Sequence, residues 1–192
     1  MKKPFVTLEQ LQEIAKDYPT PFHLYDERGI RENARALYKA FSWNPGFKEY
    51  FAVKATPNPQ ILKLLREEGC GVDCSSLTEL MMSERCGFSG REIMFSSNET
   101  PAEEFELAAK LGAVINLDDI THVDFLHKTL GRVPETVCCR FNPGGVFTLG
   151  EGGGGFQVMD NPGEAKYGMT RPQLVQAFTR LKALGAKHFG IH

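Results

Sequence analysis

A lysine that follows an apolar segment is the residue of this sequence best placed to do covalent chemistry. The segment Lys48–Lys54 contains the apolar run Tyr50–Val53 directly before Lys54. Apolar residues on both faces are typical of a strand buried in a parallel sheet, and alternation would place Lys54 on the face of Tyr50 and Ala52. Ligands bind at the carboxyl ends of such strands. Burial there favours the neutral amine, which can attack an aldehyde to form a Schiff base. Composition alone favours the simpler interpretation, a lysine whose amine reaches solvent.

The elements that would position this lysine alternate regularly from residue 48 onward. Apolar segments are separated by helices with clear start signals. Asn58-Pro59 is an N-cap followed by proline at the first helical position, and Ser76 with Glu79 forms a capping box. A first helix is predicted over about residues 26–41. The expected strands are Lys48–Lys54, Cys70–Cys74, Glu92–Phe95, Ala113–Leu117, Val137–Phe141 and His188–His192.

This alternation predicts an α/β fold in which right-handed crossovers join parallel strands. It fits either an open doubly wound sheet or a (β/α)₈ barrel. The pattern alone slightly favours the open sheet, because a barrel usually takes about 250 residues. The last expected strand runs to the final residue, His192. The chain is therefore expected to be a piece of something longer.

Composition narrows the class of partner. The chain has 192 residues and a net charge of −2, which gives no electrostatic attraction to nucleic acid or to an anionic membrane. No apolar run approaches the roughly 20 residues needed to span a bilayer, and no signal-peptide pattern opens the sequence. The five cysteines are an odd number, and Cys138 and Cys139 are neighbours in one expected strand, with side chains on opposite faces. Reduced thiols and a cytoplasmic location are expected.

Six segments carry a resemblance to a known family. Tyr50-Phe51-Ala52-Val53-Lys54-Ala55 resembles the cofactor-lysine motif of the group IV pyridoxal-phosphate decarboxylases, which include diaminopimelate, ornithine and arginine decarboxylases. Segments similar to that family in order and spacing are Thr20–Asp26, Gly71–Leu80, Arg140–Gly144, Ala165–Met169 and Gly190–His192. The resemblance implies a TIM barrel of the alanine-racemase-like class, truncated after about six strands. Residues 1–25 would form an opening strand segment and residues 26–192 a partial barrel, with the C-terminal β domain absent from this chain.

The resemblance also implies residue roles and a cofactor, pyridoxal 5'-phosphate. Lys54 would bind the cofactor aldehyde, and Asp73 would stabilise the protonated Schiff base beside it; the alternative for Asp73 is a loop cap. Arg140 would face the cofactor's phenolic oxygen; the alternative is a charge paired at the sheet edge. His192 lies near the position where the family stacks a histidine on the pyridine ring, although that histidine corresponds to a position two residues further on.

Other polar positions are less informative. Glu79 fits a site-side acid in the family and a helix cap equally well, and Asn98 fits a barrel-mouth residue or a cap. Gly150–Gly155 matches the dinucleotide-binding pattern, but without the helix and acidic residue that this pattern needs. His122 and His127 are expected at the surface, and no metal site is predicted.

The expected activity is decarboxylation of a free amino acid, a small-molecule substrate. Meso-diaminopimelate, which would give L-lysine, is preferred because Phe141–Gly144 and residues 98–118 are most similar to that branch. Asp73–Ser76 is also similar to the ornithine branch, so ornithine, arginine and carboxynorspermidine decarboxylases remain alternatives. A non-catalytic pyridoxal-phosphate homeostasis protein and a cofactor-free binding module remain too. A homodimer is expected of the full-length protein. The phosphate loop, the partner of the pyridine nitrogen and the cysteine that reaches across the dimer are expected beyond residue 192, so the isolated chain should be inactive.

Overall fold

The computed structural model of the chain describes residues 3–144 and 167–192, which form two compact units that divide between Phe47 and Lys48. The first unit holds α1 (Leu8–Asp17) and α2 (Glu27–Ala40). Asp26 caps α2 by accepting a hydrogen bond from the Gly29 amide at 3.1 Å, which confirms the helix predicted there. The sequence predicts a boundary between residues 25 and 26, which would group α2 with the barrel. The structure divides the chain after α2 instead.

The opening strand expected within Thr20–Asp26 is not assigned in this structure. The segment runs irregularly between α1 and α2. A strand exists only with a hydrogen-bonded neighbour, and the structure assigns this segment none among the residues that it describes.

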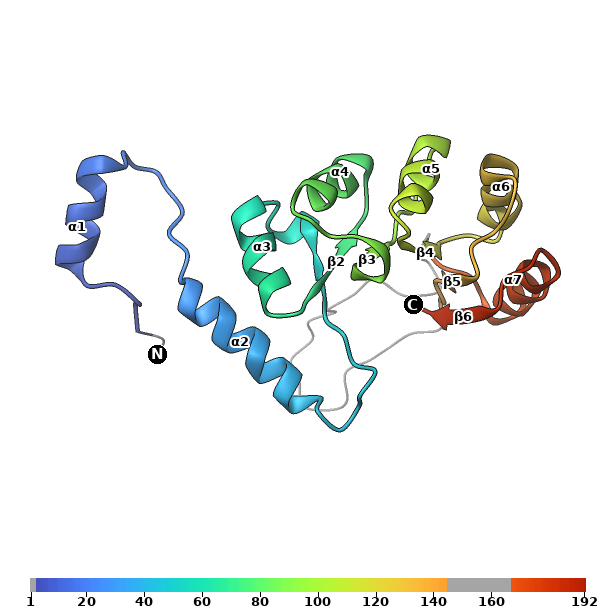
Figure 1. The fold of residues 1–192 in the computed structure, drawn as a ribbon, viewed down its shortest axis with the longest axis horizontal. Helices are drawn as coiled ribbons and strands as arrows, with labels where there is room; N and C mark the ends of the chain where they lie inside the picture. Colours follow the sequence, from blue (N-terminus) through green and yellow to red (C-terminus); the bar gives the residue numbers. More distant parts are fainter. Residues whose placement is uncertain (1–2, 145–166) are drawn as a thin grey trace. The chain divides into compact units, whose positions relative to one another are not determined.

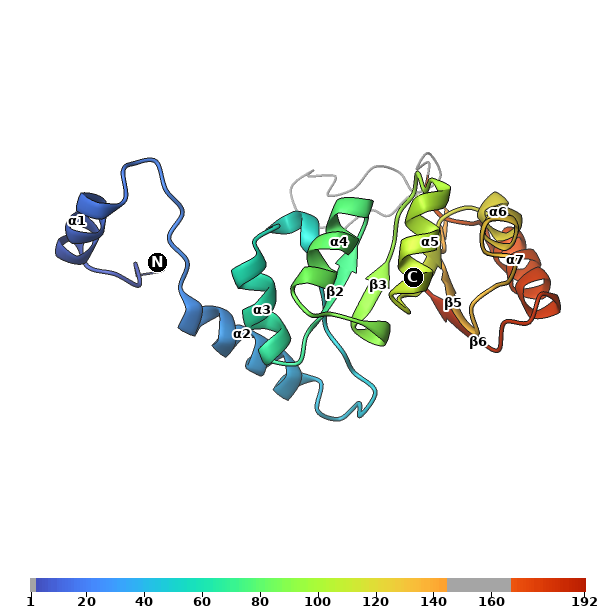
Figure 2. The same cartoon turned by 45° about the horizontal axis from the view of Figure 1, so that its top comes forward.

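The second unit is a parallel sheet of six strands whose order in the sheet is their order in the chain. A doubly wound sheet reverses its strand order at a switch point, and no reversal occurs here. The described strands therefore form an arc of a (β/α) barrel (Figures 1 and 2). This outcome overturns the slight preference for an open sheet. The strands are β1 (Tyr50–Ala52), β2 (Gly71–Cys74), β3 (Ile93–Phe95), β4 (Val114–Leu117), β5 (Thr136–Cys139) and β6 (His188–Ile191).

Helices follow the strands as the start signals predict. Asn58 caps α3 through the Gln60 amide at 2.9 Å, with Pro59 in the first turn. Ser76 caps α4 through the Glu79 amide. The helices are α3 (Pro59–Glu67), α4 (Leu77–Arg85), α5 (Ala102–Lys110), α6 (Thr121–Leu130) and α7 (Arg171–Ala183), with 3₁₀ turns η1 (Val53–Ala55) and η2 (Gly90–Glu92).

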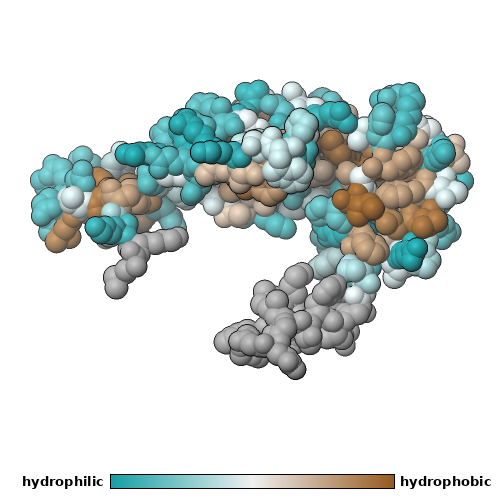
Figure 3. Space-filling model, turned by 90° about the horizontal axis from the view of Figure 1, so that it is seen from below, coloured by the Kyte–Doolittle hydropathy of each residue, from teal (hydrophilic) through white to brown (hydrophobic). Residues whose placement is uncertain are grey.

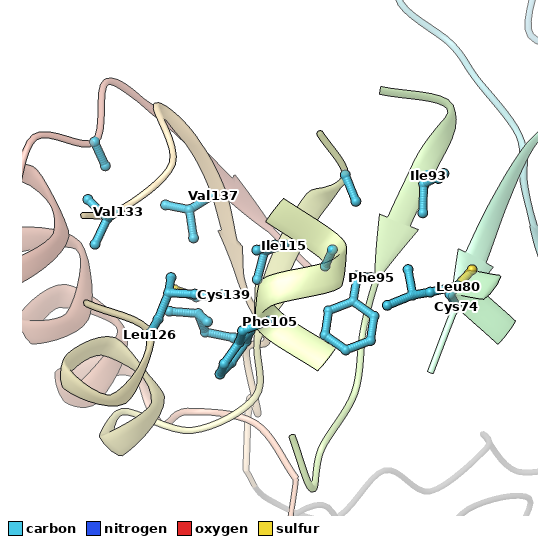
Figure 4. Close-up of a cluster of buried hydrophobic side chains, with 14 of the residues drawn as sticks. Cys74, Leu80, Ile93, Phe95, Phe105, Ile115, Leu126, Val133, Val137 and Cys139 are labelled. Carbon is cyan, nitrogen blue, oxygen red and sulfur yellow. The ribbon is translucent and has the colours of Figure 1, made fainter. Parts of the chain in front are cut away.

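The two faces of the sheet differ in chemistry. On the helix-covered face, the strand side chains are buried against apolar residues of the helices, as Figure 4 shows. The Phe95 ring of β3 meets the Phe105 ring of α5 edge-on, with centroids 6.3 Å apart, and burying one such side chain contributes about 1.5–3 kcal/mol. The strand residues of this face are Val72, Cys74, Ile93, Phe95, Ile115, Leu117, Val137 and Cys139.

The opposite face carries the polar residues. Strand register places Asp73 beside Ala52 and Met94, and Asn116 beside Cys138. Side chains in register on neighbouring strands share a face. The polar residues that could take part in chemistry therefore lie on one side of the sheet. Cys138 and Cys139 are successive residues of β5 and point to opposite faces, as predicted, and all five cysteines are buried and outside disulfides.

The last strand leaves apolar surface uncovered. Ile191 is 66% exposed and Phe189 is 38% exposed, although the Phe189 ring also packs on Phe178 of α7. Figure 3 shows brown surface over this region of β6 and α7. Separately, the helices among the described residues include none that is both long and apolar enough to cross a membrane.

Candidate active site

Lys54 lies in η1, the turn that directly follows β1. The strand expected to reach Lys54 ends at Ala52, because the Thr56 amide donates to the Val53 carbonyl at 3.2 Å and closes a turn. The expected alternation therefore stops before the lysine. Val53 is fully buried and anchors this turn, while Lys54 is exposed at the carboxyl end of β1. The amine is thus accessible at the edge where barrel ligands bind.

Asp73 lies in β2, the neighbour of β1. Its Oδ1 accepts a hydrogen bond from the Ser96 hydroxyl at 2.5 Å. Burial raises the pKa of Asp73 above its ordinary value, since desolvation disfavours the charged form. The Ser96 hydrogen bond and the positive charges of His192 and Lys54 act in the opposite direction and lower this pKa. The charges of Lys54 and His192 therefore both act on the pKa of the Asp73 carboxyl group.

Arg140 directly follows β5 and forms an ion pair with Asp118, which directly follows β4. Arg140 Nη1 lies 2.5 Å from Asp118 Oδ1, and the Asp118 side chain is only 4% exposed. The Arg140 amide donates to the Leu117 carbonyl at 2.8 Å and continues the ladder between the two strands. The pair fixes the guanidinium at the carboxyl edge of the sheet, so the paired-charge alternative for Arg140 is met. Its contact with a cofactor stays a prediction.

His192 follows β6 and joins the same cluster. Its Nδ1 lies 3.2 Å from Asn116 Nδ2 and 3.3 Å from Arg140 Nε. The guanidinium nitrogen can only donate, so Nδ1 accepts and the neutral ring carries its proton on Nε2. Burial, and then the charge of Arg140, lower the pKa of His192, while Asp73 and Asp118 raise it. This environment favours the neutral imidazole.

Glu79 lies in the first turn of α4, and its carboxylate reaches back to the loop that follows β2. Its Oε2 accepts a hydrogen bond from the Ser75 amide at 2.8 Å, and its own amide is capped by Ser76. The capping interpretation therefore accounts for its contacts, while its negative charge raises the pKa of Asp73. Asn98 is exposed in the loop after β3. No hydrogen bond of the cluster that the structure describes involves Asn98.

Two other predicted features have different outcomes. Gly150–Gly155 and Lys166 lie outside the described residues. His122 was expected at the surface, and this expectation is wrong: the ring is half-buried edge-on against Phe105, with centroids 6.0 Å apart. Burial lowers the pKa of His122.

Three members of the cluster were missed from the sequence: Ser96, Asn116 and Asp118. Ser96 and Asp118 directly follow β3 and β4, and Asn116 lies inside β4. All three are buried. Ser96 and Asp118 share with Lys54 a place directly after an apolar segment. This signal could have placed them at the carboxyl edge of the sheet, but it does not indicate their partners.

Residues 27–189 match the family described as "Pyridoxal-dependent decarboxylase, pyridoxal binding domain". The chain belongs to this family of decarboxylases. The match confirms the cofactor expected from the sequence, pyridoxal 5'-phosphate, and the barrel fold. The arrangement fits this cofactor, since an exposed amine stands at the end of β1, beside the strand that carries the Asp73 carboxylate. The Asn116 Oδ1 is also buried without a hydrogen-bond partner among the described residues.

Two curated proteins are among those to which the chain is similar. It is 41% identical over 182 residues to Protein TabA of Pseudomonas amygdali pv. tabaci, covering 95% of this chain and 41% of that protein. It is 29% identical over 182 residues to a diaminopimelate decarboxylase of Thermoplasma acidophilum, covering 95% of this chain and 42% of the relative. The chain thus spans about two-fifths of the curated relatives that it matches.

A solved structure shows the same fold. The diaminopimelate decarboxylase of M. jannaschii, determined in co-complex with L-lysine, superposes with a TM-score of 0.77 at 24% identity. The superposition covers 94% of this chain and 43% of that chain. At this identity the likeness concerns the fold alone.

Proposed function

We propose that the protein carrying this domain decarboxylates a free amino acid with pyridoxal phosphate, and that Lys54 binds the cofactor. The observation that carries the proposal is the polar cluster at the carboxyl ends of neighbouring strands in a pyridoxal-binding domain. The bound cofactor supplies an electron-accepting ring for the electrons of the broken Cα–carboxylate bond.

The residues of this chain divide the remaining work. Lys54, whose amine is accessible at the end of β1, would hold the cofactor through its aldehyde group. Asp73 supplies a negative charge near the lysine and favours a positive charge there. Arg140, held by Asp118, offers a fixed cation to the cofactor's phenolic oxygen. His192, uncharged with its Nε2 proton available, offers a flat ring beside them.

Reductive labelling tests the lysine. Borohydride treatment of the intact protein with its cofactor, followed by peptide mapping, should place the pyridoxyl group on Lys54. The K54A variant should lose the label, while K63A, which removes a lysine of α3, should keep it. A label on any other lysine contradicts the assignment.

For the substrate we propose meso-diaminopimelate, with L-lysine as product. Support comes from the relatives of that name and from the similarity of Phe141–Gly144 and residues 98–118 to that branch. The test is carbon dioxide release from a panel containing meso-diaminopimelate, L-ornithine, L-arginine and carboxynorspermidine, with products identified by mass. Faster turnover of another member reassigns the substrate. Cofactor binding without any turnover would favour a homeostasis protein.

We extend the proposal to a homodimer in the cytoplasm, in keeping with the family resemblance of the sequence. Sedimentation of the intact protein, with and without cofactor, tests the dimer. A monomer at micromolar concentration contradicts it.

A further inference from the structure

Ser96 is buried at the carboxyl end of β3, between the strands that carry the rest of the cluster. It is 6% exposed. Its amide donates to the Cys74 carbonyl at 2.8 Å, and its hydroxyl donates to Asp73 Oδ1 at 2.5 Å. Ser96 is therefore tied to β2 by its backbone and by its side chain. Two attachments to one neighbouring strand leave the hydroxyl little freedom to turn away from Asp73.

This hydrogen bond engages one of the two carboxylate oxygens of Asp73. Among the hydrogen bonds of the described residues, Asp73 is engaged only through Oδ1, so Oδ2 is the oxygen left to face a cationic group. A hydroxyl that donates to a carboxylate forms a short, charge-assisted hydrogen bond. Such a bond both orients the carboxylate and favours its charged form.

We propose that Ser96 is a positioning residue that orients the Asp73 carboxylate and keeps it ionised for the reaction at Lys54. The inference rests on the proposed function, and it deepens that function by naming the group that holds the carboxylate in its working state. Nothing in the sequence segment Ser96-Ser97-Asn98 distinguishes this role from that of an ordinary loop serine.

The charges around Asp73 show why such a group is needed. Burial and the negative charge of Glu79 raise the pKa of Asp73, whereas His192 and Lys54 lower it through their positive charges. The help from His192 depends on its protonation, and burial shifts this residue toward its neutral form. The Ser96 hydroxyl is uncharged, so its effect persists when the charge of His192 is lost.

The direct test is the titration of the Asp73 carboxyl group in the intact protein after removal of cofactor with hydroxylamine. Aspartate labelled with ¹³C at the side-chain carboxyl gives one resonance per residue, and D73N identifies the resonance of Asp73. S96A should raise the Asp73 pKa by about one pH unit, the size expected for loss of one charge-assisted hydrogen bond. S96T keeps the hydroxyl and should leave the titration close to that of the wild type.

Control variants separate this role from a packing role. S97A removes the neighbouring buried hydroxyl of the same loop and should leave the Asp73 titration unchanged. If S96A does not fold, S96C keeps the volume with a weaker donor and should shift the pKa in the same direction by less. An Asp73 pKa that is equal in the wild type and in S96A, or in S96C where that variant is used, overturns the inference.

A second readout distinguishes this inference from the proposed function. With cofactor bound, the visible band of the S96A protein should change at a higher pH than that of the wild type, while S96T should follow the wild type. Failure of every variant to bind cofactor would overturn the proposed function but leave the carboxyl titration as a test of the pair. If the cofactor labels Lys54 but S96A changes neither titration, the proposed role of Ser96 is overturned and the proposed function stands.

Discussion

The ion pair between Arg140 and Asp118 predicts an unequal response to removing either charge. The Asp118 side chain is 4% exposed and that of Arg140 is 23% exposed, with 2.5 Å between Nη1 and Oδ1. R140Q leaves a carboxylate in a site that water hardly reaches, and breaking a buried pair in this way costs about 3–5 kcal/mol. D118N leaves a guanidinium that still reaches water and can still donate to an amide oxygen. This variant should lower the free energy of unfolding by only about 1 kcal/mol.

The assay is urea unfolding of the intact protein at pH 7.5 without cofactor, followed by circular dichroism. The double variant D118N/R140Q should be more stable than R140Q alone, because the stranded carboxylate is gone. The matched control is the exposed pair of Lys187 and Glu135, whose atoms are 2.6 Å apart but whose side chains are 63% and 67% exposed. K187Q should cost less than about 1 kcal/mol. The reasoning is refuted if D118N costs as much as R140Q, or if K187Q does.

Three further outcomes follow from the structure. Burial raises the pKa values of Cys74 and Cys139 to about 12, so at pH 8 only about one thiol in ten thousand is ionised. Mass spectrometry after iodoacetamide treatment should find both cysteines unmodified in the folded protein and alkylated in urea. Rapid labelling of the folded form would contradict this expectation. A Cβ atom added at Gly190 would overlap the sulfur of Cys138 and would lie 3.5 Å from the Cys138 Cβ. G190A should therefore destabilise the protein, and C138A in the same chain should restore much of the lost stability. Equal stability of G190A and wild type in thermal unfolding would exclude the overlap. The raised pKa of Asp73 means that its carboxyl group binds a proton more tightly in the folded protein than in the unfolded chain, so the contribution of Asp73 to stability falls as pH rises above about 4. D73N should therefore be more stable than wild type at neutral pH and no more stable below about pH 4. A gain in stability that is independent of pH would be inconsistent with this linkage.

The sequence by itself determined the elements and two of the site residues. Strand segments are visible because residues such as Val72 and Ile115 must be apolar to pack under the helices, and helix starts are visible because Asn58 and Ser76 satisfy amides locally. Asp73 was identified through the resemblance of the segment Gly71–Leu80 to the decarboxylase family. Lys54 was found because it follows an apolar segment that resembles the family's cofactor-lysine motif, although a turn, rather than the expected strand, presents it.

Strand order and the partners of the polar residues were decided only by the tertiary structure. Strand–helix alternation reads the same in an open sheet and in a barrel, since crossover connections place no local signal on which strand becomes the neighbour. Ser96 and Asp118 look like ordinary loop residues in the sequence. They gain partners only when the register sets β3 beside β2 and β5 beside β4. The hydrogen bond between Ser96 and Asp73 and the ion pair between Arg140 and Asp118 join residues 23 and 22 positions apart. Both depend on that register, and no local pattern of the chain encodes it.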